Sequence, residues 1–184
     1  IDYKLVDDIA REVARLLVED KVVDWFQGGM EAGPRALGNR SILGNPTHRA
    51  TYGRLNNIKN REQWRPLAPS FLDEKLGEYM TDASSSPFML RAFLVRPEMR
   101  DRIPAAVHVD GTSRAQTVTE KDNPLYYMVI KEFEAITGVP AVMNTSFNLE
   151  FEPIVCAPED AIRTFYSSGA DYLAMGDVLI SKNS

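Results

Sequence analysis

Basic side chains gather in one stretch of the chain, between residues 35 and 65. Seven Lys and Arg residues lie there beside a single acidic residue, Glu62. Arginine is well suited to bind carboxylate or phosphate oxygens, because its planar guanidinium donates two parallel hydrogen bonds. The stretch therefore indicates a site for a small anion, although a solvated charged surface would have the same composition.

The first part of this stretch overlaps a glycine-rich segment, residues 28–41, that carries Arg35 and Arg40. Glycines let the backbone approach a ligand closely, and Pro34 fixes the start of a turn whose free N–H groups favour an anion. The segment has neither the Gly-Lys-Ser/Thr of a Walker loop nor the Gly-x-Gly-x-x-Gly of a dinucleotide-binding loop. Taken alone, such a loop is more often structural than ligand-binding.

The second part, residues 57–70, holds Lys59, Arg61 and Arg65. If this part is extended, the three cations point to one face, because alternate residues share a face. Three cations on one face repel one another unless an anion lies between them, which favours a polyphosphate site. A solvated loop in which Glu62 neutralises a neighbour is an equally good interpretation.

Short polar side chains follow an apolar run at residues 139–143, namely Asn144, Ser146 and Asn148. Open α/β sheets bind ligands beyond the ends of their strands. On this segment alone, however, an Asx turn that ends a strand is the better interpretation. His108 and Asp110 could form a metal pair, but two ligands do not make a metal site, and a hydrogen-bonded strand histidine is favoured.

The elements that position these residues are predicted from periodicity and turn signals. Apolar spacing predicts a helix over residues 7–19, and Asn123-Pro124 with Gly138 delimit another. Further helices are expected over 46–57 and 158–169, and strands over 22–27, 66–72, 89–95, 107–109, 114–118, 139–143, 172–174 and 178–180. Asp110-Gly111 is typical of a hairpin turn between two of these strands. The pattern predicts an α/β (α+β) fold with a mixed β-sheet flanked by helices.

Composition restricts the class of protein. The chain has 184 residues, a net charge of -5 and 44% hydrophobic residues, which fits one globular domain over residues 1–184. An acidic protein is an unlikely partner for nucleic acid, and the apolar runs are too short to cross a membrane. The single Cys156 excludes an internal disulfide, is expected to be a buried inert thiol, and fits a reducing cytoplasm. The initial Ile1 suggests a fragment of a longer polypeptide.

Four ordered segments together resemble the C-terminal domain of the NodU/CmcH family of O-carbamoyltransferases. They are GPRALGNRSIL at 33–43, RPLAPS at 65–70, HVDGT at 108–112 and NTSFN at 144–148. Lys59-Asn60-Arg61 and Ser146-Phe147-Asn148 also resemble the Lys-x-Arg and Ser-x-Asn signature of YrdC-like proteins. The similarity covers nearly the whole chain. Two positions depart from the family pattern: Gly29, where arginine is common, and Phe151, where glycine is common.

The resemblance implies a YrdC-like fold, with a twisted mixed sheet, in one half of a two-domain enzyme. In this family the C-terminal half makes carbamoyl-adenylate from carbamoyl phosphate and ATP, which brings Mg²⁺. An N-terminal ASKHA-type domain, absent from this chain, carries a metal and moves the carbamoyl group onto an acceptor hydroxyl. The isolated domain is therefore not expected to complete the transfer, and a homodimer stays open.

The resemblance also implies roles for particular residues. It assigns Lys59 and Arg65 to phosphate oxygens, Arg35 to carbamoyl phosphate or pyrophosphate, and Arg114 to the carbamoyl or α-phosphate end. The implied catalytic residues are Lys59, Arg65, Arg114 and Ser146, and the implied binding residues are Arg35, Arg40, Arg61, Ser70, Asn144 and Asn148. No metal ligand is expected in this chain. The alternatives are a non-catalytic YrdC-like module that binds nucleotide or RNA, and a purely structural partner of the missing half.

Overall fold

An eight-stranded mixed sheet forms the centre of the protein, in a computed structural model that describes residues 1–182. Its strand order is β1-β10-β9-β2-β3-β8-β4-β7, and β5 and β6 pair separately. The pairs β2–β9 and β4–β7 are parallel and the other neighbours are antiparallel. The strands are β1 (Asp2–Leu5), β2 (Val23–Phe26), β3 (Arg40–Gly44), β4 (Ala68–Leu72), β5 (Phe93–Leu94), β6 (Thr112–Ser113), β7 (Gln116–Val118), β8 (Ala141–Ser146), β9 (Tyr172–Met175) and β10 (Val178–Ser181).

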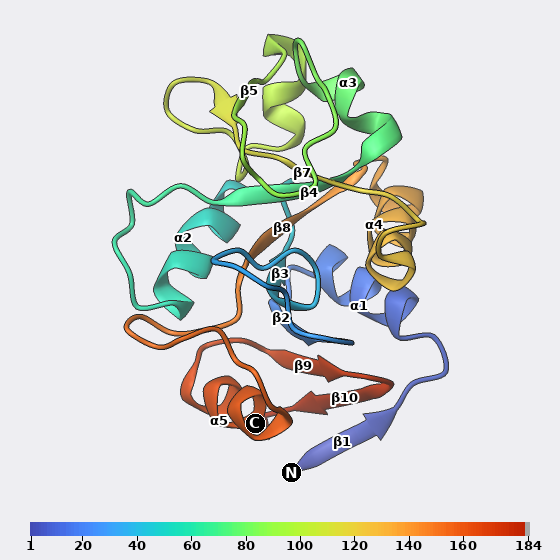
Figure 1. Ribbon diagram of the computed structural model, residues 1–184, viewed down its shortest axis with the longest axis vertical. Helices are drawn as coiled ribbons and strands as arrows, with labels where there is room; N and C mark the ends of the chain where they lie inside the picture. The colour runs from blue at the N-terminus through green and yellow to red at the C-terminus, as the bar shows by residue number, and fades with distance from the viewer. Residues whose placement is uncertain (183–184) are drawn as a thin grey trace.

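Helices cover the sheet, as Figure 1 shows. The helices are α1 (Ile9–Val18), α2 (Arg49–Ile58), α3 (Leu76–Tyr79), α4 (Pro124–Thr137) and α5 (Pro158–Ser167), with short 3-10 turns η1 (Asp73–Lys75) and η2 (Pro97–Arg102). In Figure 1, α1 and α4 lie side by side on the right of the sheet and α2 lies on its left. The predicted twisted mixed sheet flanked by helices is confirmed. No helix in the described residues is long and apolar enough to span a membrane.

Side-chain caps mark the beginnings of helices α1 and α4. Asp8 begins α1, since its side chain accepts a hydrogen bond from the Arg11 amide at 3.0 Å. Asn123 caps α4 in the same way, and Gly138 ends that helix with a φ of 69°. Left-handed backbone of this kind favours glycine, because a Cβ atom would be strained there. The helices over 7–19 and 123–138 are therefore confirmed.

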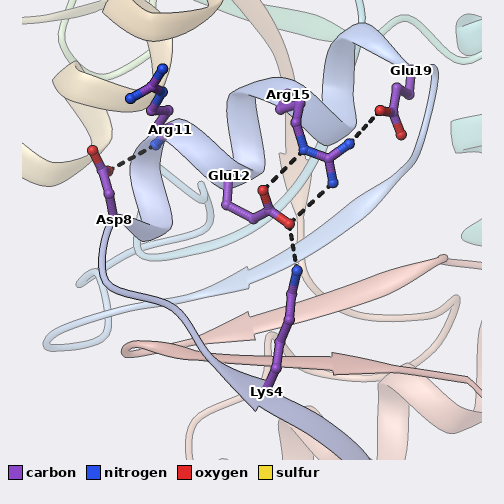
Figure 2. A network of polar contacts seen from close by, with 6 residues as sticks. All are labelled: Lys4, Asp8, Arg11, Glu12, Arg15 and Glu19. Carbon is purple, nitrogen blue, oxygen red and sulfur yellow. Dashed lines mark hydrogen bonds and ion pairs between the residues drawn. The ribbon is translucent and has the colours of Figure 1, made fainter.

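An ion-pair network ties the edge strand β1 to helix α1 (Figure 2). Lys4 of β1 lies 2.6 Å from Glu12, and Arg15 contacts both Glu12 and Glu19 on the helix. Hydrogen bonds from Arg15 and Lys4 lower the pKa of Glu12 to about 2. All four residues of β1 are exposed, so burial does little to hold this strand. It is held by its antiparallel pairing with β10 and by the ion pair from Lys4 to helix α1.

Several sequence predictions are wrong in detail. Residues 107–109 form no strand, and Asp110 instead accepts hydrogen bonds from the amide and hydroxyl of Thr112. The strand expected over 89–95 shrinks to β5, which pairs with β6, and β7 runs parallel to β4 rather than returning in a hairpin. Strands β1 and β3 were not predicted, because β1 is exposed and β3 begins with polar residues. Cys156 is exposed rather than buried.

Candidate functional site

A small pocket of about 70 Å³ lies where the glycine-rich segment, residues 61–68 and the end of β8 meet. Three arginines line it, Arg35, Arg61 and Arg114, together with Asn144 and Ser146 of β8. Within the described part of the chain, no acidic side chain lines this pocket. Its charged groups are all hydrogen-bond donors, which is the arrangement that binds an anion.

Two of the three pocket arginines, Arg61 and Arg114, are partly buried and feel the positive charge of neighbouring arginines. Burial, followed by repulsion from the nearby Arg65, lowers the pKa of Arg61 to about 10. Burial also lowers the pKa of Arg114, with a second contribution from Arg35. The buried Nε of Arg114 has no hydrogen-bond partner in residues 1–182. An anion in the pocket would relieve the repulsion among these cations.

Lys59 lies behind the pocket rather than in it. Its buried ammonium donates to the carbonyl oxygen of Ser146 at 2.6 Å and to Asn148 Oδ1 at 2.7 Å. The hydroxyl of Ser146 and the carbonyl oxygen of Asn148 lie at 3.0 and 2.9 Å. Burial, followed by repulsion from Arg61, lowers the Lys59 pKa to about 7. Because three N–H donors already face four oxygens, this lysine holds the turn after β8 in place.

A buried polar network supports Asn144 from behind. Its Nδ2 lies 3.2 Å from the carbonyl oxygen of Ala36 and 3.0 Å from both Ser70 Oγ and Gln116 Oε1. Ser70 Oγ donates to Gln116 Oε1 at 2.6 Å. Gln116 is a residue that sequence reasoning missed. Only the pairing of Ser70 with Gln116 across the parallel strands β4 and β7 identifies it, and no local pattern predicts that register.

Two of the expected site residues belong neither to the pocket lining nor to the residues directly behind it. Arg40 is buried over the ring of Phe26, and its guanidinium donates to the carbonyl oxygens of Gln27 and Gly28 at 2.7 and 3.1 Å. Those bonds give Arg40 a structural part in holding the glycine-rich segment. The Arg65 side chain is 50% exposed and pairs with Glu62 at 3.5 Å.

The other expected residues divide into two sets. The pocket itself is lined by Arg35, Arg61, Arg114, Asn144 and Ser146. A second set lies directly behind that lining and consists of Lys59, Ser70 and Asn148. Eight of the ten residues are thus in one region of the fold, which makes the arrangement a candidate anion site with a fixed polar wall.

Phe151 does not narrow this pocket. The residue is 96% exposed and is not part of the pocket lining. The backbone keeps a φ of 66°, in the left-handed region that favours glycine. Phenylalanine therefore occupies backbone at this position in which a Cβ atom is strained. Gly29 likewise lies outside the lining of the pocket.

Comparison with known proteins decides the family. Residues 14–182 match the family described as carbamoyltransferase C-terminus. The chain belongs to this carbamoyltransferase family. The carbamoyltransferase domain is 43% identical to the nodulation protein NolNO of Sinorhizobium fredii, over all of this chain and 28% of NolNO. It is 39% identical to 3'-hydroxymethylcephem-O-carbamoyltransferase of Amycolatopsis lactamdurans, over 90% of this chain and 32% of that protein. It therefore spans less than a third of the length of both relatives.

Solved structures show the fold of the carbamoyltransferase domain. Full-length HypF, in a phosphate- and nucleotide-bound form, superposes with a TM-score of 0.62 at 20% identity, over 97% of this chain and 22% of HypF. Sua5 of P. abyssi, complexed with L-threonine, gives a TM-score of 0.62 at 14% identity, over 86% of this chain and 44% of Sua5. At these identities the likeness concerns the fold alone. The YrdC-like fold implied by the sequence is confirmed.

Proposed function

We propose that this domain forms carbamoyl-adenylate from ATP and carbamoyl phosphate. An N-terminal domain of the same polypeptide would then transfer the carbamoyl group to an acceptor hydroxyl. The observation that carries the proposal is the small pocket whose only charged lining groups, within residues 1–182, are Arg35, Arg61 and Arg114. Such a pocket suits phosphate oxygens, and it lies in a domain of the carbamoyltransferase family.

The proposed chemistry has two balanced steps. Water first cleaves carbamoyl phosphate to carbamate and inorganic phosphate. A carbamate oxygen then attacks the α-phosphorus of ATP, and the bond from that phosphorus to the bridging oxygen breaks, so that pyrophosphate leaves with Mg²⁺. Phosphoryl chemistry of this kind depends mainly on positioning and on neutralising oxygen charge. Arg35, Arg61 and Arg114 would supply that neutralisation.

The remaining residues would shape the pocket. Ser146 would contact the carbamoyl or phosphate oxygens from the end of β8, and Lys59 would hold it there through the turn that ends at Asn148. Lys59 thus takes a positioning role in this proposal, in place of the direct phosphate contact that the family resemblance implies. Arg65 would act from the rim, because its side chain is half exposed beside Glu62.

Calorimetric titration of the 184-residue chain tests whether both substrates bind. We expect Mg-ATP and carbamoyl phosphate each to bind at one site, with an ATP affinity that changes when carbamoyl phosphate is present. A separate titration with single-stranded RNA tests the alternative function, an RNA-binding module. An RNA-binding module would instead bind RNA, with a slope of log affinity against log salt near -0.7 for each phosphate contacted. The proposal is contradicted if the chain binds RNA but gives no heat of binding with Mg-ATP or carbamoyl phosphate. It is also contradicted if the chain binds none of these three ligands.

A further inference from the structure

Side chains rather than secondary structure hold the loop of residues 31–39, which carries Arg35. The loop forms neither helix nor strand, and Arg35 on it is exposed. Gln116 and Trp25 fix the far end of the loop, because each donates to one of its main-chain carbonyl oxygens at 2.8 Å. The place of Arg35 therefore depends on what fixes the near end.

One carboxylate ties the start of the loop to its end. Glu31 Oε1 accepts hydrogen bonds from three backbone amides, which belong to Leu37, Asn39 and Arg40 and lie at 2.6, 2.8 and 3.4 Å. Backbone amides that converge in this way form an anion-binding nest. Hydrogen bonds to an ionised acceptor are roughly twice as strong as those between neutral groups. Glu31 thus closes the loop with its own side chain.

Glu31 acts on the loop and not on the arginine pocket. Within residues 1–182, the lining of that pocket contains Arg35 but no acidic side chain. Glu31 instead lines a separate cavity of about 440 Å³, together with Leu37 and Asn39. The carboxylate therefore binds the main chain of the loop, while Arg35 contributes its positive charge to the pocket.

The tip of the loop has little else to hold it. Gly33 has a φ of 122°, which glycine adopts without strain, and no described atom lies within 4 Å of the place that a Cβ would take there. Arg35 follows two residues later and is exposed, so its backbone sets where the guanidinium can reach. A misplacement of about 1 Å in a group that meets substrate can cost roughly a hundredfold in rate.

We propose that Glu31 is a positioning residue for Arg35: its carboxylate binds the amides of the loop and so sets the place from which Arg35 meets the anion. The inference rests on the proposed function and adds the group that fixes one wall of its pocket. Glu31 does not contact the substrate. Its removal leaves Arg35 chemically intact but unplaced, so the effect on binding appears only where Arg35 is present.

A double-mutant cycle of Glu31 and Arg35, read by titration with carbamoyl phosphate, tests the proposal. We expect Arg35→Ala to bind roughly ten- to hundredfold more weakly than wild type, and Glu31→Ala roughly tenfold more weakly. The double variant should bind within about twofold of Arg35→Ala, because no side chain is left for Glu31 to place. A merely structural role would lower affinity by the same factor whether or not Arg35 is present.

Glu31→Gln is the conservative variant. Its Oε1 still accepts from the amides, and its Nε2 replaces Oε2, which has no hydrogen-bond partner in the described residues. We expect it to bind carbamoyl phosphate within about threefold of wild type, because the loop keeps an acceptor, although a neutral and weaker one.

Asp160→Ala is the matched control. Asp160 is partly buried like Glu31, and its Oδ2 also accepts from two backbone amides, those of Cys156 and Ala157, at 3.3 and 3.1 Å. It lies outside the lining of the arginine pocket. Its loss should lower the Tm and leave the affinity for carbamoyl phosphate unchanged. Thermal melting of all variants identifies any that fail to fold. If Glu31→Ala does, Glu31→Asp, whose shorter side chain withdraws the carboxylate from the amides, replaces it in the cycle.

The outcomes separate this inference from the proposed function. Wild-type affinity in folded Glu31→Ala overturns the positioning role, and so does an equal loss in the presence and absence of Arg35. Wild-type affinity in Arg35→Ala overturns it as well, since Arg35 then has no contact for Glu31 to arrange. A wild-type chain that binds neither carbamoyl phosphate nor Mg-ATP overturns the proposed function itself.

Discussion

Lys59→Met should lower both the thermal stability of the chain and its affinity for carbamoyl phosphate. The ammonium serves four oxygens of Ser146 and Asn148 at 2.6 to 3.0 Å, and the variant leaves these atoms without their donor. Leaving buried acceptors unpaired costs roughly 2–4 kcal/mol, which is about 5–15 °C in Tm for a chain of this length. Carbamoyl phosphate should bind at least about a hundredfold more weakly, because the turn that presents Ser146 is released.

Lys131→Met is the control for this loss. Lys131 is half exposed on α4 and pairs with Glu134 at 3.1 Å, so its removal should cost less than about 0.5 kcal/mol. Differential scanning calorimetry gives the Tm and titration gives the affinity. If the Lys59→Met chain has the Tm and the carbamoyl-phosphate affinity of the wild-type chain, the buried ammonium does not hold the turn.

Arg114→Ala should weaken binding while leaving the fold intact. Arg114 lines the pocket beside Arg35, and its buried Nε has no partner in the part of the chain that the structure describes. Losing one cation from a phosphate site costs roughly 1.5–3 kcal/mol, about a ten- to hundredfold loss of carbamoyl-phosphate affinity. The Tm should change by no more than a few degrees, because the substitution also removes repulsion from Arg35.

Arg96→Ala is the control for Arg114→Ala. Arg96 is partly buried and donates to the carbonyl oxygen of Gly77 at 3.2 Å, but it lies outside the pocket lining. We expect wild-type affinity from Arg96→Ala. If Arg96→Ala and Arg114→Ala titrate alike, the arginine pocket does not bind the substrate, and the basic stretch is a solvated surface.

The elements that sequence predicted correctly are those with strong local signals. The helices that begin at Asp8 and Asn123 carry both a cap and an apolar face, so local physics determines them. Strand β3 carries no such signal: it begins with Arg40 and Ser41, and it is buried only because β2 and β8 pair with it from distant parts of the chain. Such long-range pairing cannot be deduced from one sequence.

The candidate site divides in the same way. Residue type and family resemblance indicated Arg35, Arg40 and Arg65 equally, and only their surroundings distinguish a pocket residue from a structural or rim residue. Lys59 was expected to contact phosphate because it is a cation near other cations. Its burial among backbone oxygens is a tertiary property that no spacing rule predicts.

Pyrophosphate release from Mg-ATP, followed with and without carbamoyl phosphate, is the most direct test of carbamoyl-adenylate formation. We predict that the 184-residue chain releases pyrophosphate only when both substrates are present, and that Arg114→Ala releases it far more slowly while Arg96→Ala matches wild type. Inorganic phosphate from carbamoyl phosphate should appear together with the pyrophosphate. A chain that binds both substrates but releases no pyrophosphate in response to carbamoyl phosphate would contradict an adenylating role for this domain.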